Sequence, residues 1–194
     1  MLHTSPISLR RDVELTSLEP EHAAAMFRWV SDPQISQSIG LTREPSLDKT
    51  RQWIDATRDD PRMRPFAILA AGRHVGNVVL DCIERGLGIA RLSIYIGESN
   101  VRSKGVGTTA TYQALRQAFG QLELHKVWLT VHSQNFPAIS VYSRIGFVLE
   151  GIHRDEFLME GRRLPALYMG LLKTEFLALA TVTHALSGTG DGQP

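Results

Sequence analysis

A glycine-rich turn at residues 100–109 constrains the fold of this chain more than any other stretch. The segment before it, Ile89–Ile96, is rich in strand-forming residues, and the segment Thr108–Phe119 repeats apolar side chains at helical spacing. Gly105 and Gly107 let the backbone turn tightly, and they place no Cβ between the backbone N–H groups and a ligand. A strand, a tight turn and a helix in this order predict an anion site at the start of the helix.

The charge beside this turn indicates which anion would bind. Arg102 and Lys104 flank the glycines, and with the helix dipole they suit a pyrophosphate. A P-loop would need Gly-Lys followed by Ser or Thr, whereas the order here is Lys-Gly-x-Gly-Thr. A dinucleotide fingerprint stays open, because Ala110 occupies the position of its third glycine and an Ala variant exists. The simplest alternative is a turn that binds nothing.

Composition limits the class of protein. A chain of 194 residues with 43% apolar residues can bury one core, so we expect a single domain over residues 1–186 and a disordered tail at 187–194. The net charge of +1 provides no field to attract nucleic acid or a membrane. Cys82 is the single cysteine, which excludes an internal disulfide and a cysteine-based metal cluster. With no signal-like or membrane-spanning apolar run, we expect a cytoplasmic protein without a metal.

Hydrophobic periodicity predicts alternating strands and helices of an α/β protein. The predicted strands are Arg11–Leu15, Phe66–Ala70, Val75–Asp81, Ile89–Ile96, Lys126–Val131, Phe147–Gly151 and Leu164–Leu172. The predicted helices are Pro20–Val30, Leu47–Asp59, Thr108–Phe119, a short one from Asn135 to Gly146, and Lys173–Ala185. Asp32-Pro33 is expected to stop the first helix, and Ser46 is expected to cap the second.

Several individual residues have a predicted structural place. The strands on either side of helix Thr108–Phe119 should be parallel neighbours, because the three form one crossover unit. Gly120 is expected to end that helix as its left-handed residue. Trp29 and Trp53 lie on the two early helices, where they either pack against the core or line a substrate cleft.

Two motifs in the second half of the chain resemble a known family. Arg102-x-x-Gly105-x-Gly107 follows a strand, and Asn135, Ala138, Tyr142 and Gly146-Phe147 follow later at fixed spacing. Over residues 10–175 the chain resembles the GNAT superfamily of acyl-CoA-dependent N-acyltransferases, which carries both motifs in this order. The run from Arg154 to Leu171 looks like the branch that contains ribosomal-protein and spermidine N-acetyltransferases, although Pro165-Ala166 occupies the place where that branch commonly has an acidic residue.

The resemblance implies a fold and a cofactor. The expected fold is a single-domain α/β GNAT-like mixed sheet, largely antiparallel, of about seven strands, with a central splayed parallel pair and flanking helices. The expected acyl donor is acetyl-CoA, whose pantetheine arm enters between the splayed strands. The residues expected to bind it are Ile96, Arg102, Ser103, Lys104, Gly105, Val106, Gly107, Thr108 and Asn135.

The resemblance also implies a general acid. Tyr142 stands at the family's general-acid position, and a phenol holds its proton at neutral pH. The alternative is that Tyr142 only packs its helix onto the sheet. A main-chain N–H between residues 95 and 97, where the family's strand carries a bulge, would polarise the thioester carbonyl.

The general base is less constrained. Asp81 and Glu98 are the catalytic candidates, directly or through water, and a solvated carboxylate is the alternative for both. Glu84, His132 and His74 are weaker candidates. Arg91 stands where the branch often has Glu, and it either anchors an acidic acceptor or pairs with Glu84 or Asp81.

These features together predict an acetyl-CoA-dependent N-acetyltransferase, a transferase of the acyltransferase class. It would move the acetyl group directly, through a tetrahedral intermediate, to a primary amine of a small molecule such as an amino sugar nucleotide, a polyamine or an amino-acid-like compound. The alternatives are a protein N-terminal acetyltransferase and a non-catalytic acyl-CoA-binding module. The expected partner is the small-molecule amine, with no nucleic acid and no membrane, and a homodimer is compatible with the sequence.

Overall fold

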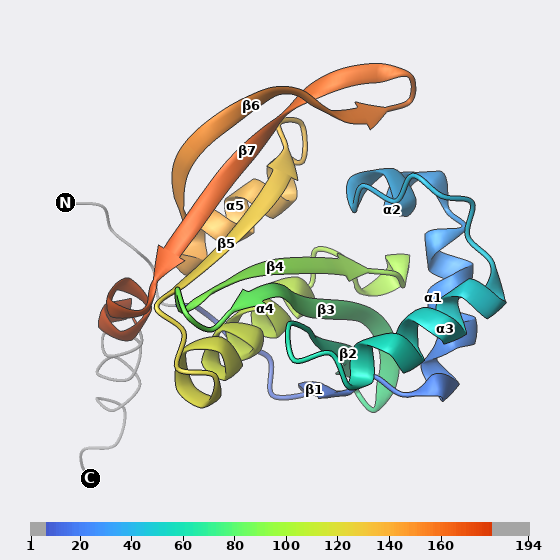
Figure 1. Ribbon diagram of the computed structural model, residues 1–194, viewed down its shortest axis with the longest axis horizontal. Helices are drawn as coiled ribbons and strands as arrows, with labels where there is room; N and C mark the ends of the chain where they lie inside the picture. The colour runs from blue at the N-terminus through green and yellow to red at the C-terminus, as the bar shows by residue number, and fades with distance from the viewer. Residues whose placement is uncertain (1–6, 180–194) are drawn as a thin grey trace, which may run out of the picture.

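Seven strands form one mixed sheet in the order β1-β2-β3-β4-β5-β7-β6 (Figure 1). The protein is described by a computed structural model over residues 7–179. Every neighbouring pair of strands is antiparallel except β4 and β5, which are parallel as the crossover unit predicts. The strands are β1 Val13–Ser17, β2 Arg64–Ala70, β3 Arg73–Glu84, β4 Ile89–Ile96, β5 Lys126–His132, β6 Val148–Met159 and β7 Arg162–Leu172.

Helices cover both faces of the sheet (Figure 1). Helices α4 and α5 pack with the largest hydrophobic cluster, whereas α1 and α3 enclose a smaller one against β2 that includes Met26, Ile54 and Ala67. The α-helices are α1 Ala23–Val30, α2 Pro33–Ser38, α3 Leu47–Arg58, α4 Val106–Arg116 and α5 Phe136–Ile145. Short turns are η1 Pro20–His22, η2 Ser99–Val101 and the π-helical η3 Gln117–Gln121, and residues 173–179 are helical.

Alternation along β3 separates the two faces of the sheet. Val78 and Leu80 are fully buried in the cluster beneath α4. Asn77, Val79 and Asp81, which point to the opposite face, line a pocket beside α1 and α3. One strand therefore supplies both a core layer and the floor of a cavity.

The parallel pair separates along its length. Hydrogen-bonded pairing joins Ile89–Arg91 of β4 to Lys126–Trp128 of β5 and does not continue, although β4 runs on to Ile96 and β5 to His132. The expected fold, a largely antiparallel sheet of seven strands with a central splayed parallel pair, is confirmed. Within residues 7–179, the edge of β4 beyond Arg91 that faces β5 therefore has no paired strand.

Three local predictions need correction. Asp32 caps a new helix, α2, with Pro33 in its first turn, so the chain does not simply stop being helical there. Gly120 is not a left-handed cap, because the backbone widens into the π-helical turn, with Leu122 N–H donating to the Gln117 carbonyl, and the left-handed residue is Glu123 at φ 53°. The strand predicted at residues 147–151 extends to Met159. The prediction ended too early because most of the strand is exposed, and its polar residues hide the alternation of apolar and polar side chains.

Two predicted segments are only partly described. The terminal helix predicted over residues 173–185 is helical over 173–179, and its remainder lies outside the described residues. The tail at 187–194 also lies outside them. Within residues 7–179, no helix has the length and apolar character needed to cross a membrane.

Candidate functional site

The start of α4 presents backbone N–H groups without helical partners. Gly105 caps the helix in the left-handed conformation at φ 79°, and the first helical hydrogen bond runs from Thr109 N–H to the Gly105 carbonyl. The N–H groups of Val106, Gly107 and Thr108 consequently have no carbonyl within the helix to bind. Together with the helix dipole they are oriented as an anion site requires, at the position where the sequence predicts one.

Gly107 has no packing reason to be glycine. Among the described residues, a Cβ built on it would meet only Ile96 Cγ1, at 3.8 Å, which is ordinary van der Waals contact. Gly105, by contrast, needs glycine for its positive φ. The space above Gly107 is therefore open within the protein, as a bound pyrophosphate close to the backbone requires.

The predicted cations flank this loop in different ways. The Arg102 guanidinium donates to the carbonyls of Ile96 and Gly97, from Nε at 3.0 Å and from Nη2 at 3.1 Å, so it fixes the loop to the end of β4. Lys104 and Ser103 are exposed. The sequence interpretation missed Arg10, whose Nη1 donates to the Lys104 carbonyl at 3.0 Å.

The end of β4 is irregular, as a bulge would be. The N–H groups of Gly97 and Glu98 both donate to the Val75 carbonyl on β3, at 2.8 and 3.1 Å. Because N–H directions alternate along a strand, the N–H of Ile96 points to the other edge, toward the diverging β5. Among residues 95–97, Ile96 is therefore the residue positioned to offer a main-chain donor to the cleft.

Tyr142 and Asn135 both lie on α5. Asn135 caps the helix, with its side-chain oxygen accepting from Ala138 N–H at 3.3 Å. Tyr142 is 8% exposed, and its ring lies edge-on to Phe147 with the ring centroids 5.8 Å apart. Burial raises the pKa of the Tyr142 phenol to about 12, which keeps it protonated at neutral pH. The packing role and a proton-donor role are compatible in this position.

The two carboxylates predicted as bases are both engaged. Asp81 accepts two hydrogen bonds from Arg91, from Nε at 2.7 Å and from Nη2 at 3.0 Å. Of the places suggested for Arg91 by the sequence, the structure therefore shows the pairing with Asp81. Glu98 accepts from Arg28 and, at 3.1 Å, from the Trp29 indole N–H. Asp81 lines the pocket, whereas Glu98 does not.

Burial or other contacts make the three weaker candidates less suited to accept a proton. Burial lowers the pKa of His74 to about 4 and also lowers that of His132, so both rings are neutral at neutral pH. His74 packs between His22 and Trp29. The carboxylate of Glu84 accepts the N–H of a turn residue and lies outside the pocket.

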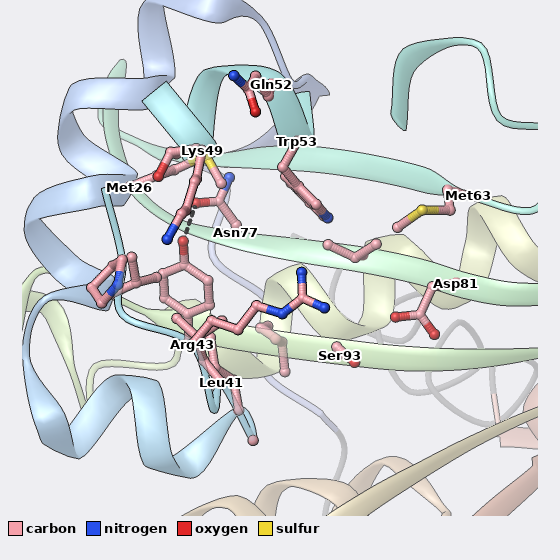
Figure 2. A pocket seen from close by; sticks show the side chains of 18 of the residues that line it. Met26, Leu41, Arg43, Lys49, Gln52, Trp53, Met63, Asn77, Asp81 and Ser93 are labelled. Carbon is pink, nitrogen blue, oxygen red and sulfur yellow. Dashed lines mark hydrogen bonds between the residues drawn. The ribbon is translucent and has the colours of Figure 1, made fainter. Parts of the chain in front are cut away.

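A pocket of about 680 Å³ lies on the face of the sheet opposite α4 (Figure 2). Its walls are α1, residues 39–46, α3 and the strands β3 and β4. Trp53, 36% exposed, lines the pocket, whereas Trp29 is buried. Of the two roles suggested by the sequence, Trp53 therefore lines a cleft and Trp29 packs against the core. Residues 39–46 were not predicted to contribute, and no motif in the sequence marks them.

The Acetyltransferase (GNAT) domain model matches residues 12–148 of this chain. The chain belongs to the GNAT acetyltransferase family. It is similar to the spermidine N(1)-acetyltransferase of Escherichia coli K12, at 31% identity over 169 residues, which covers 87% of this chain and 85% of that protein. This similarity agrees with the branch that the sequence predicts, which contains the spermidine N-acetyltransferases.

Solved structures agree with the family. A spermidine N-acetyltransferase from Vibrio cholerae in complex with CoA and spermine superposes with a TM-score of 0.82 at 26% identity, covering 87% of this chain and 99% of that one. A dodecameric structure of spermidine N-acetyltransferase from the same organism superposes with a TM-score of 0.75 at 26% identity, covering 87% and 98%. The GNAT family assignment confirms an acetyl-CoA-dependent N-acetyltransferase, with acetyl-CoA as the acyl donor.

Proposed function

We propose that this GNAT protein transfers the acetyl group of acetyl-CoA directly to a primary amine of a small molecule. The observation that carries the proposal is the free edge of β4 beyond Arg91, which lies between the amides of the α4 start and the pocket lined by Arg91, Ser93 and Tyr95. A cofactor held on one side and an amine held on the other would meet at this edge.

The donor side divides between two groups of residues. The pyrophosphate binds the N–H groups of Val106, Gly107 and Thr108, with Ser103 and Lys104 beside it. The pantetheine arm runs along the β4 edge, where Ile96 and Asn135 offer polar groups. The Ile96 N–H polarises the thioester carbonyl and stabilises the oxyanion as the amine attacks.

The protons move between groups already described. The amine attacks the thioester carbon, the tetrahedral intermediate collapses, and the carbon–sulfur bond breaks to release coenzyme A as a thiolate. Tyr142 donates its phenolic proton to that sulfur, and the proton that the attacking nitrogen loses as it becomes an amide returns through solvent to restore the phenol. The ammonium form of the acceptor first loses a proton, which a bridging water passes to the Asp81 carboxylate, because the pairing with Arg91 keeps that carboxylate from approaching the amine directly. Glu98 is the second candidate for this role.

A panel of amines tests the proposal. Purified protein is mixed with acetyl-CoA and, in turn, amino sugars, amino acids, polyamines and a peptide with a free N-terminus, and thiol release is followed. We expect release that depends on one class of small amine and an acetylated product in mass spectrometry. Tight acetyl-CoA binding with no amine-dependent thiol release would instead identify a non-catalytic acyl-CoA-binding module, and release with the peptide alone would identify a protein N-terminal acetyltransferase.

Self-association is part of the proposal. The relative from Vibrio cholerae has a dodecameric structure, and here the edge strand β6 exposes Val148, Leu149 and Ile152 to 50% or more. An exposed apolar edge strand favours pairing with a second copy. Light scattering at several concentrations should give a mass of at least a dimer, and a monomer at all of them would contradict this.

A further inference from the structure

The charges that line the pocket are unusual for a site that would hold a polyamine. Three cationic side chains, Arg43, Lys49 and Arg91, line it together with two carboxylates, Glu44 and Asp81. A polyamine carries several positive charges at neutral pH, because alkylamines have pKa values of about 10. Like charges within one pocket repel, so a polyamine needs more carboxylates here than cations.

One of the two carboxylates is not available to an acceptor. The Asp81 side chain is 13% exposed, and both of its oxygens accept from Arg91 in the two-bond geometry of a guanidinium and a carboxylate. This pair is internally neutral. The remaining charged groups of the pocket are Arg43, Lys49 and Glu44, all of them exposed and located just before α3 or in its first turn.

Arg43 is the cation with unfilled donors. Figure 2 shows its side chain extending into the pocket, with the guanidinium between the side chains of Trp53 and Ser93 in this view. Within residues 7–179 it makes no hydrogen bond and no ion pair. Lys49, in contrast, donates to the Glu44 carbonyl at 3.3 Å and so holds its own segment together. A guanidinium that lines a pocket and has no partner among the described residues can bind a planar oxyanion through two parallel donors.

We infer that the acceptor amine carries a carboxylate or a phosphate, and that Arg43 is the specificity-determining residue that binds this group. The inference rests on the proposed function, and it narrows that function to anionic amines such as amino acids or phosphorylated amino sugars. Arg43 binds the anion through two parallel N–H donors, while the amine points to the free β4 edge. Polyamines, which suit the relatives named above, are poor acceptors for this pocket.

Matched pairs of acceptors test the inference. One pair is an α-amino acid and its carboxamide, and the other is an amino sugar phosphate and the unphosphorylated amino sugar, with spermidine as a fifth compound. We expect kcat/KM to favour the anionic member of one pair by roughly 10- to 100-fold, the range that charge-assisted hydrogen bonds supply. The pair that shows the preference tells a carboxylate from a phosphate. Higher kcat/KM for spermidine than for both anionic amines would overturn the inference.

Two substitutions at Arg43 then test whether this residue causes the preference for anionic acceptors. Arg43→Gln should raise KM for the anionic member by roughly 10- to 100-fold and leave its neutral partner within about 2-fold, and Arg43→Lys should restore part of the difference. Arg51→Gln is the control, since it removes one exposed positive charge of α3 outside the pocket. An equal loss on both members of the pair, or the same loss in Arg51→Gln, would refute a role for Arg43.

A binding titration separates this inference from the proposed function. Calorimetry on the protein saturated with coenzyme A measures the affinity for the amino acid and its carboxamide, and for the amino sugar phosphate and its unphosphorylated partner. Absence of turnover with every amine would refute the proposed function alone. Tighter binding of one anionic member, lost in Arg43→Gln, would still support the anion site, whereas equal affinity within both pairs in the wild-type protein would overturn it.

Discussion

Asp81 and Arg91 face each other across β3 and β4, and the carboxylate of Asp81 receives both the Nε and the Nη2 of Arg91. The two strands pair these residues directly, which sets the geometry before any substrate binds. The pair therefore combines two proposed activities in one place, a carboxylate able to accept a proton through water and a cation that holds that carboxylate in position.

Substitutions at this pair separate the two activities. If Asp81 is the base, Asp81→Asn should lower kcat/KM by roughly 10²- to 10⁴-fold and remove the ascending limb of its pH profile, so that activity rises only as the amine itself deprotonates. The double variant Asp81→Asn with Arg91→Gln should be equally slow. Recovery of activity in the double variant would mean that Asp81 only neutralises Arg91, and a lost limb in Glu98→Gln would assign the base to Glu98.

Tyr142→Phe tests the proton donor. Acetyl-CoA affinity should stay within a few fold, because the ring still packs on Phe147, while kcat falls by roughly 10²- to 10⁴-fold. Burial raises the pKa of Tyr142 to about 12, so the protonated phenol persists as pH rises and the wild-type profile should show no descending limb near about pH 10, the ordinary tyrosine value. Wild-type kcat in the Phe variant would show that solvent or another group protonates the leaving thiolate.

Cys82 should be a bystander. It is exposed and its thiol pKa is raised, chiefly by desolvation and then by the adjacent Asp81 charge, so little thiolate forms at neutral pH. Cys82→Ala is expected to keep kcat within about 2-fold, as direct transfer requires. Detection of an acetylated Cys82 by mass spectrometry during turnover would contradict direct transfer.

Gly97 ties the end of β4 to α1. A Cβ at Gly97 would overlap the indole ring of the buried Trp29, so Gly97→Ala should lower the free energy of unfolding by about 1–3 kcal/mol. Gly120→Ala is the matched control, because its Cβ would meet nothing within 4 Å and its φ is not positive. Equal unfolding midpoints in denaturant for the two variants would show that the Trp29 contact does not constrain the strand end.

The predictions from sequence succeeded where the signal is local. The strand, glycine turn and helix around Gly105 depend on neighbouring residues, as does the short helix that starts at Asn135, and both formed as expected. Gly120 misled the prediction because a glycine near a helix end is typical of a left-handed cap, whereas the helix here widens into a π-helical turn. Local signals carry little information on such backbone variants.

The pocket could not be predicted because segments far apart in the chain form it. Arg43, Trp53 and Asp81 meet only after the sheet and the helix positions are fixed. The partner of Arg91 was open between two carboxylates, and strand register, a long-range property, selects Asp81 over Glu84. That Arg43 has no hydrogen-bond or ion-pair partner in the described part of the chain is likewise visible only once every neighbour is in place.

Titration of the protein with acetyl-CoA, for the wild type and for Gly107→Val, tests the central claim most directly. A Cβ at Gly107 makes only ordinary van der Waals contact with the described residues, so the variant should fold with an unchanged circular dichroism spectrum. The same side chain would occupy the space of the pyrophosphate beside the α4 amides, and calorimetry should show binding by the wild type and none by the variant. Equal affinity in a folded Gly107→Val protein would contradict the account.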